Sequence, residues 1–255
     1  GLPTIKIVTG YKINGKTVTS FPSDLMQLNP ENGFEPEFIE TLTTALVADV
    51  SASVAFCDHW IVDQFGQRRV ADTESASRFW GRTKLQEGLH RPFLSLLAAQ
   101  TIPMAMGSVF RRSVLPRNLP DFAGPAYDLW LTYLLARGGQ GAIYVGQRLS
   151  SWRTHQGNLT SQMGVDWLQG AADCWQAVAE DPACVAIRDL SLRKAARGYA
   201  SSSVKALLAS RRRDGMYLAA RSLRSRVTAK GLVARVLSLL PLPMSQHLLT
   251  LARRR

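Results

Sequence analysis

Hydrophobic and polar positions follow two different patterns along this chain. Up to about residue 162, short β-type runs alternate with helical patterns, whereas beyond that point only helical periodicity continues. Alternating strands and helices are typical of an α/β fold, and helices alone are typical of a separate bundle or appendage. The pattern therefore predicts an α/β domain over residues 1–162 and an all-helical region over residues 163–255.

The predicted elements of the first region are short. The stretch between Asp58 and Ser95 is polar and gives no clear periodic signal. The elements predicted on either side of it are strands at Ile5–Val8 and Lys16–Val18 around an Asn14-Gly15 turn, a helix at Glu37–Ala48, a strand at Ser53–Cys57, a helix at His90–Gln100 and a strand at Ile102–Phe110.

An acidic residue, Asp128, stands at the head of the most apolar helical pattern in the chain. The pattern ends at Gly138 and Gly139, and glycine is common just after a helix C-terminus. A helix this apolar is expected to be mostly buried. Asp near a helix start often accepts backbone N–H bonds, so Asp128 is either a simple cap or a reactive carboxylate.

A basic cluster follows that helix. Ala142–Val145 is a short β-type run, and the sequence Trp-Arg-Thr-His that ends at His155 is expected to lie in a loop after it. This order brings an acid and a base-rich loop to one edge of the domain. Arg153 and His155 are then either ligands of an anionic group or solvated loop residues.

Four blocks, in their order and spacing, resemble one family. The last is the Asp128–His155 stretch, and the others are Leu-Asn-Pro-Glu-Asn-Gly-Phe-Glu-Pro-Glu-Phe-Ile-Glu (28–40), Cys-Asp-His-Trp-Ile-Val-Asp-Gln-Phe-Gly (57–66), and Phe-Arg-Arg (110–112) with Val114-Leu115 and Phe122. Together they are similar to segments of family 2 glycosyltransferases, which are inverting enzymes of the GT-A fold.

The resemblance implies a GT-A-like, Rossmann-like mixed sheet and an activity. The activity is transfer of a sugar, with inversion, from a nucleotide-sugar to a hydroxyl of a saccharide or lipid-linked acceptor, such as a cell-envelope polysaccharide or a glycolipid. By register with the family, Asp128 is the general base that takes the acceptor proton. The other implied site residues are Arg153, His155 and Asn29 on the donor diphosphate, and Arg111, Arg112 and Trp130 on the acceptor side.

Two departures from the family bear on the donor site. The metal-binding Asp-x-Asp is replaced by Asn29-Pro30-Glu31, with Asn32 next, so that Glu31 alone keeps a carboxylate. The implied cofactor is a divalent cation, Mg²⁺ or Mn²⁺, held by Glu31, Asn29 and Asn32, and the alternative is a solvated loop. Only 28 residues precede Asn29, so we expect an N-terminally truncated catalytic domain.

The positive charge of the chain is concentrated at its end. Residues 190–255 hold 15 Lys and Arg but a single acid, Asp214, which gives that segment a net charge of +14. The whole chain has a net charge of +12, so all of its excess positive charge lies in this segment. Amphipathic basic helices such as Met216–Arg226 and Gly231–Leu240 could lie on an anionic membrane surface. The alternative is a bundle that keeps its charged face in water. A nucleic-acid-binding protein would also explain this charge, but no nucleic-acid module is recognisable, so no nucleic-acid partner is expected.

Five helices are predicted in this second region. Pro241 and Pro243 separate the last two. The predicted ranges are Val165–Ala179, Pro182–Leu208, Asp214–Arg226, Lys230–Leu240 and Met244–Arg255.

Composition limits the remaining possibilities. With 255 residues and 46% hydrophobic content the chain can bury a sizeable core, and it has no uninterrupted apolar run of transmembrane length. Three cysteines without a Cys-x-x-Cys spacing indicate reduced, buried thiols rather than a zinc site. The expected location is cytoplasmic, or peripheral at the inner face of the cell membrane. A catalytically silent remnant that binds a membrane or a partner is the alternative function.

Overall fold

The chain forms two compact units. A computed structural model describes residues 12–13, 16–17, 32–116, 119–154 and 164–253. One unit comprises residues 1–121 and 127–161, and the other comprises residues 122–126 and 162–255. The division in the chain therefore falls beside residue 162, where the periodicity changes, but the short segment 122–126 belongs with the helices and was not expected there.

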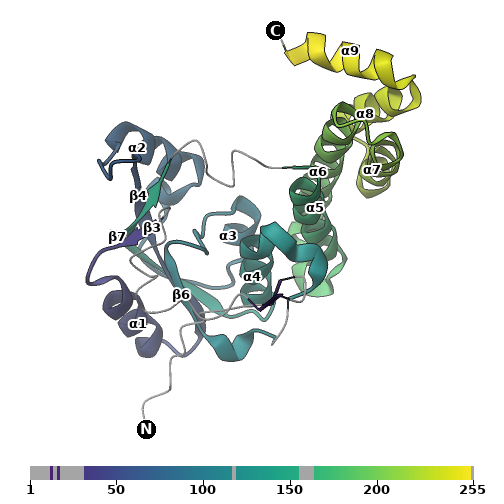
Figure 1. Ribbon diagram of the computed structural model, residues 1–255. Helices are drawn as coiled ribbons and strands as arrows, with labels where there is room; N and C mark the ends of the chain where they lie inside the picture. The colour runs from purple at the N-terminus through teal and green to yellow at the C-terminus, as the bar shows by residue number, and fades with distance from the viewer. Residues whose placement is uncertain (1–11, 14–15, 18–31, 117–118, 155–163, 254–255) are drawn as a thin grey trace. The chain divides into compact units, whose positions relative to one another are not determined.

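The first unit is built on a five-stranded mixed sheet (Figure 1). Its two long strands, β4 and β7, run parallel to each other, and the three short strands pair antiparallel with them. The order is β3-β7-β4-β6, and β5 pairs with β7. The unit is thus a mixed α/β structure, as the pattern predicted. The strands are β3 (Asn32–Phe34), β4 (Ala52–Val62), β5 (Gly88–His90), β6 (Ser108–Phe110) and β7 (Gly141–Arg153).

Helices cover this sheet. On one face, Phe38, Leu42 and Leu46 of the first helix pack against Ala55 and Cys57 of β4 in a fully buried cluster. These three positions repeat every four residues, which aligns them along one side of a helix. The helices of the unit are α1 (Phe38–Ala48), α2 (Val70–Phe79), α3 (Leu94–Ala99) and α4 (Tyr127–Ala136).

Both long strands extend beyond the predicted runs. The β4 strand was expected to end at Cys57 but continues to Val62, and β7 runs on to Arg153 where a loop was expected. The loop prediction was wrong because the end of β7 is paired on both sides, with β4 along one edge and with β3 along the other. Pairing between distant segments, rather than local sequence, sets these lengths.

Other short elements also differ from the prediction. The strand expected at Ile102–Phe110 is reduced to the three residues of β6, and the helix expected at His90–Gln100 to the six residues of α3. The polar stretch that gave no signal contains α2 and β5. Near the N-terminus, β2 (Lys16–Thr17) falls within the predicted strand Lys16–Val18, but its antiparallel partner is β1 (Lys12–Ile13), which was not predicted, and Ile5–Val8 lies outside the described residues.

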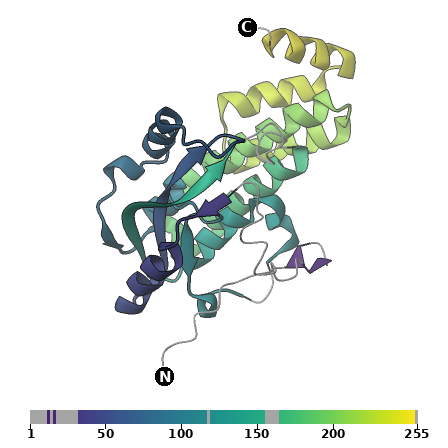
Figure 2. The same cartoon turned by 60° about the vertical axis from the view of Figure 1, so that its left-hand side comes forward.

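The second unit is helical (Figures 1 and 2). All five predicted helices are present, with ends shifted by a few residues; the first turns of the predicted Pro182–Leu208 helix form a separate 3₁₀ segment, Pro182–Ile187. No helix in the described part of the chain is long and apolar enough to cross a membrane. The helices are α5 (Val165–Glu180), α6 (Arg188–Leu208), α7 (Arg212–Ser225), α8 (Ala229–Leu239) and α9 (Leu242–Arg253).

Small residues bring α5, α6 and α7 close together. A Cβ placed on Gly198 of α6 would lie 2.8 Å from the Cβ of Ala172 of α5, so the two helices approach too closely for a larger side chain there. The buried hydroxyls of Ser203 and Ser222 donate to backbone carbonyls across the α6–α7 contact, at 2.7 and 2.8 Å. These bonds satisfy the polar groups that the close packing buries.

Candidate active site

Asp128 lies in the first turn of α4. The rest of that helix is held by its apolar side, where Leu131 and Leu135 are buried. The Asp128 side chain is exposed, and its Oδ1 accepts a hydrogen bond from the Leu129 N–H at 2.8 Å. The helix is therefore fixed through its buried residues and presents a carboxylate at its accessible end.

The protein around the Asp128 carboxyl group raises its pKa. Desolvation is the largest cause, and the bond from the Leu129 N–H opposes it. The residue nevertheless exposes a large part of its surface to water. A carboxylate with a raised pKa accepts a proton more readily than an ordinary one, which suits a general base.

Trp130 lies two residues further along α4 and is half-buried. Its ring and that of Tyr133 are tilted against each other with centroids 4.7 Å apart. This aromatic pair accounts for the tryptophan as a packing residue. The role of Trp130 in stacking an acceptor sugar stays a prediction.

Arg111 and Arg112 donate hydrogen bonds to backbone carbonyls of the first unit. The Arg111 guanidinium donates to the carbonyl of Ala52 at 2.8 Å and to those of Leu46 and Asp49 at the C-terminal end of α1. Arg112 Nη1 donates to the Leu115 carbonyl at 2.7 Å. A cation at a helix C-terminus satisfies carbonyls that lack partners within the helix. These bonds explain the Arg-Arg pair as a structural feature, and contact with an acceptor stays a prediction.

Arg153 lies at the C-terminal end of β7. Its Nη1 donates to the carbonyls of Gln64 and Asp63, at 3.0 and 3.4 Å, in the turn that follows β4. α4 ends shortly before Gly141, where β7 begins, so that Arg153 lies at the other end of this strand. A strand of 13 residues spans about 40 Å. The ten residues of α4 span only about 15 Å. Asp128 and Arg153 are therefore far from forming one compact group, although both were expected at one edge.

The remaining predicted site residues lie largely beyond the description. Asn29, Glu31 and His155 are outside the described residues, and of the predicted metal ligands only Asn32, the first residue of β3, is within them. Among the described residues there is no group of three or more His, Cys, Asp and Glu that could hold a metal ion. The Mg²⁺ or Mn²⁺ site thus stays a prediction.

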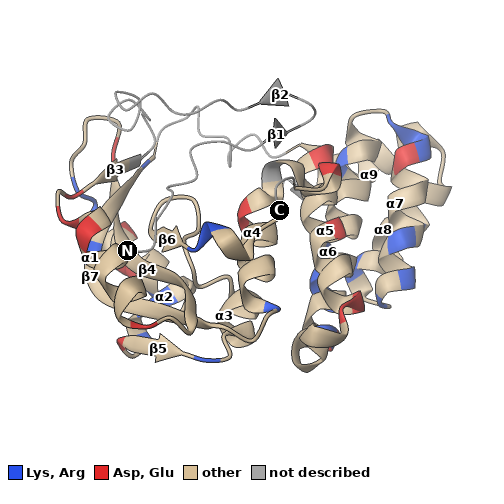
Figure 3. Cartoon of the chain, turned by 90° about the horizontal axis from the view of Figure 1, so that it is seen from below, with Lys and Arg blue, Asp and Glu red and all other residues tan. Residues whose placement is uncertain are grey.

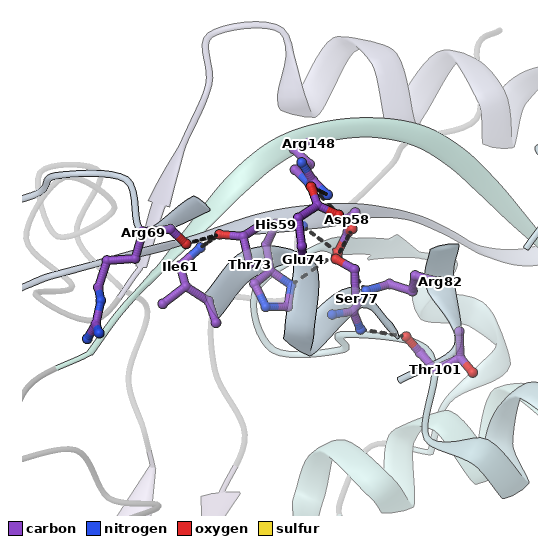
Figure 4. Close-up of polar contacts among 10 residues, drawn as sticks. All are labelled: Asp58, His59, Ile61, Arg69, Thr73, Glu74, Ser77, Arg82, Thr101 and Arg148. Atoms are coloured by element: carbon purple, nitrogen blue, oxygen red, sulfur yellow. Dashed lines mark hydrogen bonds and ion pairs between the residues drawn. The ribbon is translucent and has the colours of Figure 1, made fainter. Parts of the chain in front are cut away.

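A buried polar cluster in the middle of the sheet was not predicted. We define the Asp58 cluster as Asp58, His59, Ser77, Arg82 and Arg148, whose side chains converge beside β4 (Figure 4). Asp58 and Arg82 expose only 4% and 3% of their surface, so their charges compensate each other away from water.

The Asp58 carboxylate has a partner for each oxygen. Oδ1 accepts from Arg82 Nε at 2.6 Å and from the His59 N–H at 2.9 Å, and Oδ2 accepts from the Ser77 hydroxyl at 2.5 Å. Arg148 Nε lies 3.5 Å from Oδ2. Burial alone would raise the pKa of Asp58, but Arg82 and these hydrogen bonds hold it below its ordinary value. A saturated, buried carboxylate of this kind has no oxygen left for a substrate, and it ties α2 and the turn holding Arg82 to β4.

An irregularity in the sheet makes room for the cluster. β4 and β7 change register on both sides of Asp58, which is paired with Arg148, while Cys57 is paired with Val145. Two residues of β7, Gly146 and Gln147, are therefore inserted opposite one step of β4. Such a bulge redirects a side chain, and here Arg148 also reaches Glu74 at 2.8 Å.

His59 is buried beside Asp58 and is held neutral. Desolvation and the positive charge of Arg82 lower its pKa to about 4, against the opposing effect of Asp58. Its Nδ1 is buried without a hydrogen-bond partner among the described residues. The ring stands edge-on to Trp152, with centroids 6.5 Å apart, which is favourable for a neutral imidazole in an apolar setting.

One signal in the sequence could have located this cluster. Asp58 interrupts an apolar run that continues with Trp60, Ile61 and Val62, and a charged residue inside a buried strand requires a partner. Nothing local identifies that partner, because Arg82 is 24 residues away and Arg148 is 90.

Comparisons with protein-family models, with curated proteins and with solved structures give no match. The resemblance to family 2 glycosyltransferases therefore rests on the four sequence blocks alone.

Proposed function

We propose that the chain is a glycosyltransferase of GT-A-like fold that transfers a sugar from a nucleotide-sugar to an acceptor hydroxyl with inversion. The observation that supports this most is Asp128, an accessible carboxylate of raised pKa at the head of a buried helix. It occupies the position that the resemblance gives to the catalytic acid. The mixed sheet with one parallel pair of long strands is compatible with the proposal.

The proposed chemistry assigns one role to Asp128. An acceptor alcohol is a weak nucleophile at neutral pH, so its oxygen attacks the anomeric carbon as a carboxylate removes its proton. The bond from the sugar to the diphosphate breaks on the opposite face, and the nucleoside diphosphate leaves. The resemblance assigns the donor diphosphate to Arg153 and His155, but because Arg153 lies far from Asp128 along β7, we do not place it in the same site, and no step in this scheme depends on a metal.

The test is release of nucleoside diphosphate from a panel of nucleotide-sugars, with and without simple alcohol acceptors. Asp128→Asn should lower the rate by about 10²–10⁴-fold and leave nucleotide affinity unchanged, because the amide cannot take the proton. Asp121→Asn is the matched control, since Asp121 is also exposed and lies seven residues earlier. Equal turnover of the wild type and Asp128→Asn would remove Asp128 from the reaction.

A second candidate is a catalytically silent protein that binds a membrane or a partner. The observation in its favour is the set of apolar side chains left exposed on α8 and α9. It predicts that no nucleotide-sugar binds even at millimolar concentration. Ligand-observed NMR with the same panel distinguishes the two candidates, since a functional donor site would give saturable binding.

A further inference from the structure

The last two helices each carry two apolar stripes, of which one is exposed. On α8, Ala234 and Leu237 are buried, whereas Leu232, Val236 and Leu239 are 49%, 60% and 54% exposed. The exposed positions follow the spacing i, i+4, i+7, which places them on one side of a helix. The buried residues lie on the opposite side, so the exposed stripe is not the one that packs in the bundle.

α9 repeats the arrangement. Leu249 packs with Leu207 and Leu237 in a buried cluster. Met244, Leu248 and Leu251 are 52%, 44% and 47% exposed and share the spacing i, i+4, i+7. We call the six exposed side chains of α8 and α9 the outer stripes. Single exposed apolar residues are ordinary, whereas exposed apolar residues that gather on one side of a helix are a feature of binding surfaces.

α7 shows what a helix without such a stripe looks like. It was a candidate for membrane contact by sequence, yet Leu218 and Ala219 are fully buried and its small residues are bonded to α6. Its apolar side is therefore used inside the bundle. The apolar face of α7 is therefore covered, and contact of this helix with a membrane stays a prediction that rests on its charge.

The segment that carries the outer stripes has a net positive charge. After Asp214 the chain has eight Lys and Arg and no Asp or Glu. Arg224 of α7 is exposed, Lys230 of α8 reaches the Ser201 hydroxyl of α6 at 2.7 Å, and Figure 3 shows Lys and Arg on both α7 and α8. Apolar stripes on a segment with this net positive charge are complementary to an apolar layer that lies beneath an anionic one. A lipid headgroup interface that contains acidic lipids has this structure.

We infer that the outer stripes of α8 and α9 bind the surface of an anionic lipid bilayer. The helices lie in the headgroup region, the six apolar side chains enter the acyl boundary, and Lys and Arg side chains of the same segment contact lipid phosphates. The inference does not depend on the proposed sugar transfer, since neither Asp128 nor the sheet takes part in it.

Sedimentation with vesicles tests the inference on the full chain. We expect binding to mixed phosphatidylcholine and phosphatidylglycerol vesicles, weak binding to pure phosphatidylcholine, and release at about 1 M salt, where the Debye length is about 3 Å. Leu232→Gln with Leu239→Gln should weaken the partition coefficient about tenfold or more, since two aliphatic side chains no longer enter the apolar layer. Met244→Gln with Leu248→Gln should act similarly.

The matched control changes two exposed apolar residues elsewhere in the same unit. Val185→Gln with Leu190→Gln, on the 3₁₀ segment and α6, removes comparable apolar surface and should leave vesicle binding unchanged. Because all these positions are exposed, the variants should keep the wild-type thermal unfolding curve, which circular dichroism checks.

A second readout locates the inserted surface. All three native cysteines are buried, so a thiol introduced by Val236→Cys can be labelled selectively with an environment-sensitive dye. Its emission should shift to shorter wavelength with anionic vesicles, and a dye at Val185→Cys should not respond. A wild type that ignores vesicles, or outer-stripe variants that bind as the wild type does, would overturn the inference. Concentration-dependent dimers that the same variants disrupt, without vesicle binding, would show that a second copy of the chain covers the stripes instead.

Discussion

Asp58 and Asp128 are the same residue type in opposite settings. Asp58 is buried in the sheet, bonded at both oxygens and paired with Arg82, and its pKa is lowered. Asp128 is exposed at a helix end, accepts a backbone hydrogen bond from Leu129, and its pKa is raised. The Asp58 carboxylate bonds to residues of other elements and so stabilises their packing, whereas the Asp128 carboxylate has oxygen lone pairs that can accept a proton or a hydrogen bond from another molecule. Charge neutralisation, not depth alone, separates a structural carboxylate from a candidate catalytic one.

The largest expected effect comes from Asp58. Asp58→Asn should lower the free energy of unfolding by about 3–5 kcal/mol, because it leaves Arg82 charged and buried without its counter-ion. Urea unfolding followed by tryptophan fluorescence measures this. The control is Asp72→Asn, which breaks an ion pair to Arg69 whose side chains are both about half exposed and should cost about 1 kcal/mol or less. Similar losses in both variants would show that the Asp58 cluster is not the anchor described.

The next effect concerns His59 and acid. Its pKa is about 4 in the folded chain and 6.5 as an ordinary histidine, so the unfolded state binds more protons between these values. The contribution of a neutral His59 to the free energy of unfolding should therefore be fully present above about pH 6.5. It should fall as the pH drops towards 4, by up to about 3 kcal/mol. His59→Gln should flatten this part of the stability profile, and His247→Gln, at an exposed position of α9, should leave it as in the wild type. An unchanged slope in His59→Gln would argue against a neutral buried imidazole.

Asp58 adds a further loss at lower pH. Because the pKa of Asp58 is depressed below its ordinary value, its contribution to stability is present above that ordinary value and disappears as the pH falls through the folded-state pKa. In Asp58→Asn this last part of the acid transition should be absent. The comparison of His59→Gln and Asp58→Asn across the whole acid range separates the two groups.

The smallest effect on stability is expected at Asp128. A carboxyl group with a raised pKa stabilises the fold only at low pH, and this contribution is lost as the pH rises. Asp128→Asn should therefore unfold at pH 7 within about 0.5 kcal/mol of the wild type, or slightly above it, opposite in sign to Asp58→Asn. A large destabilisation would indicate that Asp128 mainly caps α4, the alternative that the sequence left open.

Local signals predicted the helices better than the sheet. The five C-terminal helices follow from 3.6-residue periodicity and from breaks at Pro and Gly, which operate within a few residues. The lengths of β4 and β7 depend on partners far away in the chain, so that Arg148–Arg153 was expected to be a loop. Residue type and position suggested Asp128 at a helix head, but only the structure shows it to be accessible.

The same difference explains the site residues. Arg111 donates to carbonyls 59 to 65 residues away, which no local motif reveals. The partners of Asp58 likewise come from α2, from the turn after it and from β7. The sequence patterns of α7 and α8 are similarly amphipathic. Only the packing shows that the apolar face of α7 is buried in the bundle whereas α8 also leaves apolar side chains exposed.

The short strands at the margins of the sheet limit strand pairing between copies of the chain at high concentration. β4 and β7 lie inside the sheet, and its described margins are formed by β3, β5 and β6, each three residues long. β3 and β5 share one edge of β7 and are separated there by the bulge at Gly146 and Gln147. A neighbouring molecule that tried to extend this sheet would find only a few free backbone groups in a row, too few to template a growing ribbon. Short outer strands thus shield two long, apolar inner ones from aggregation.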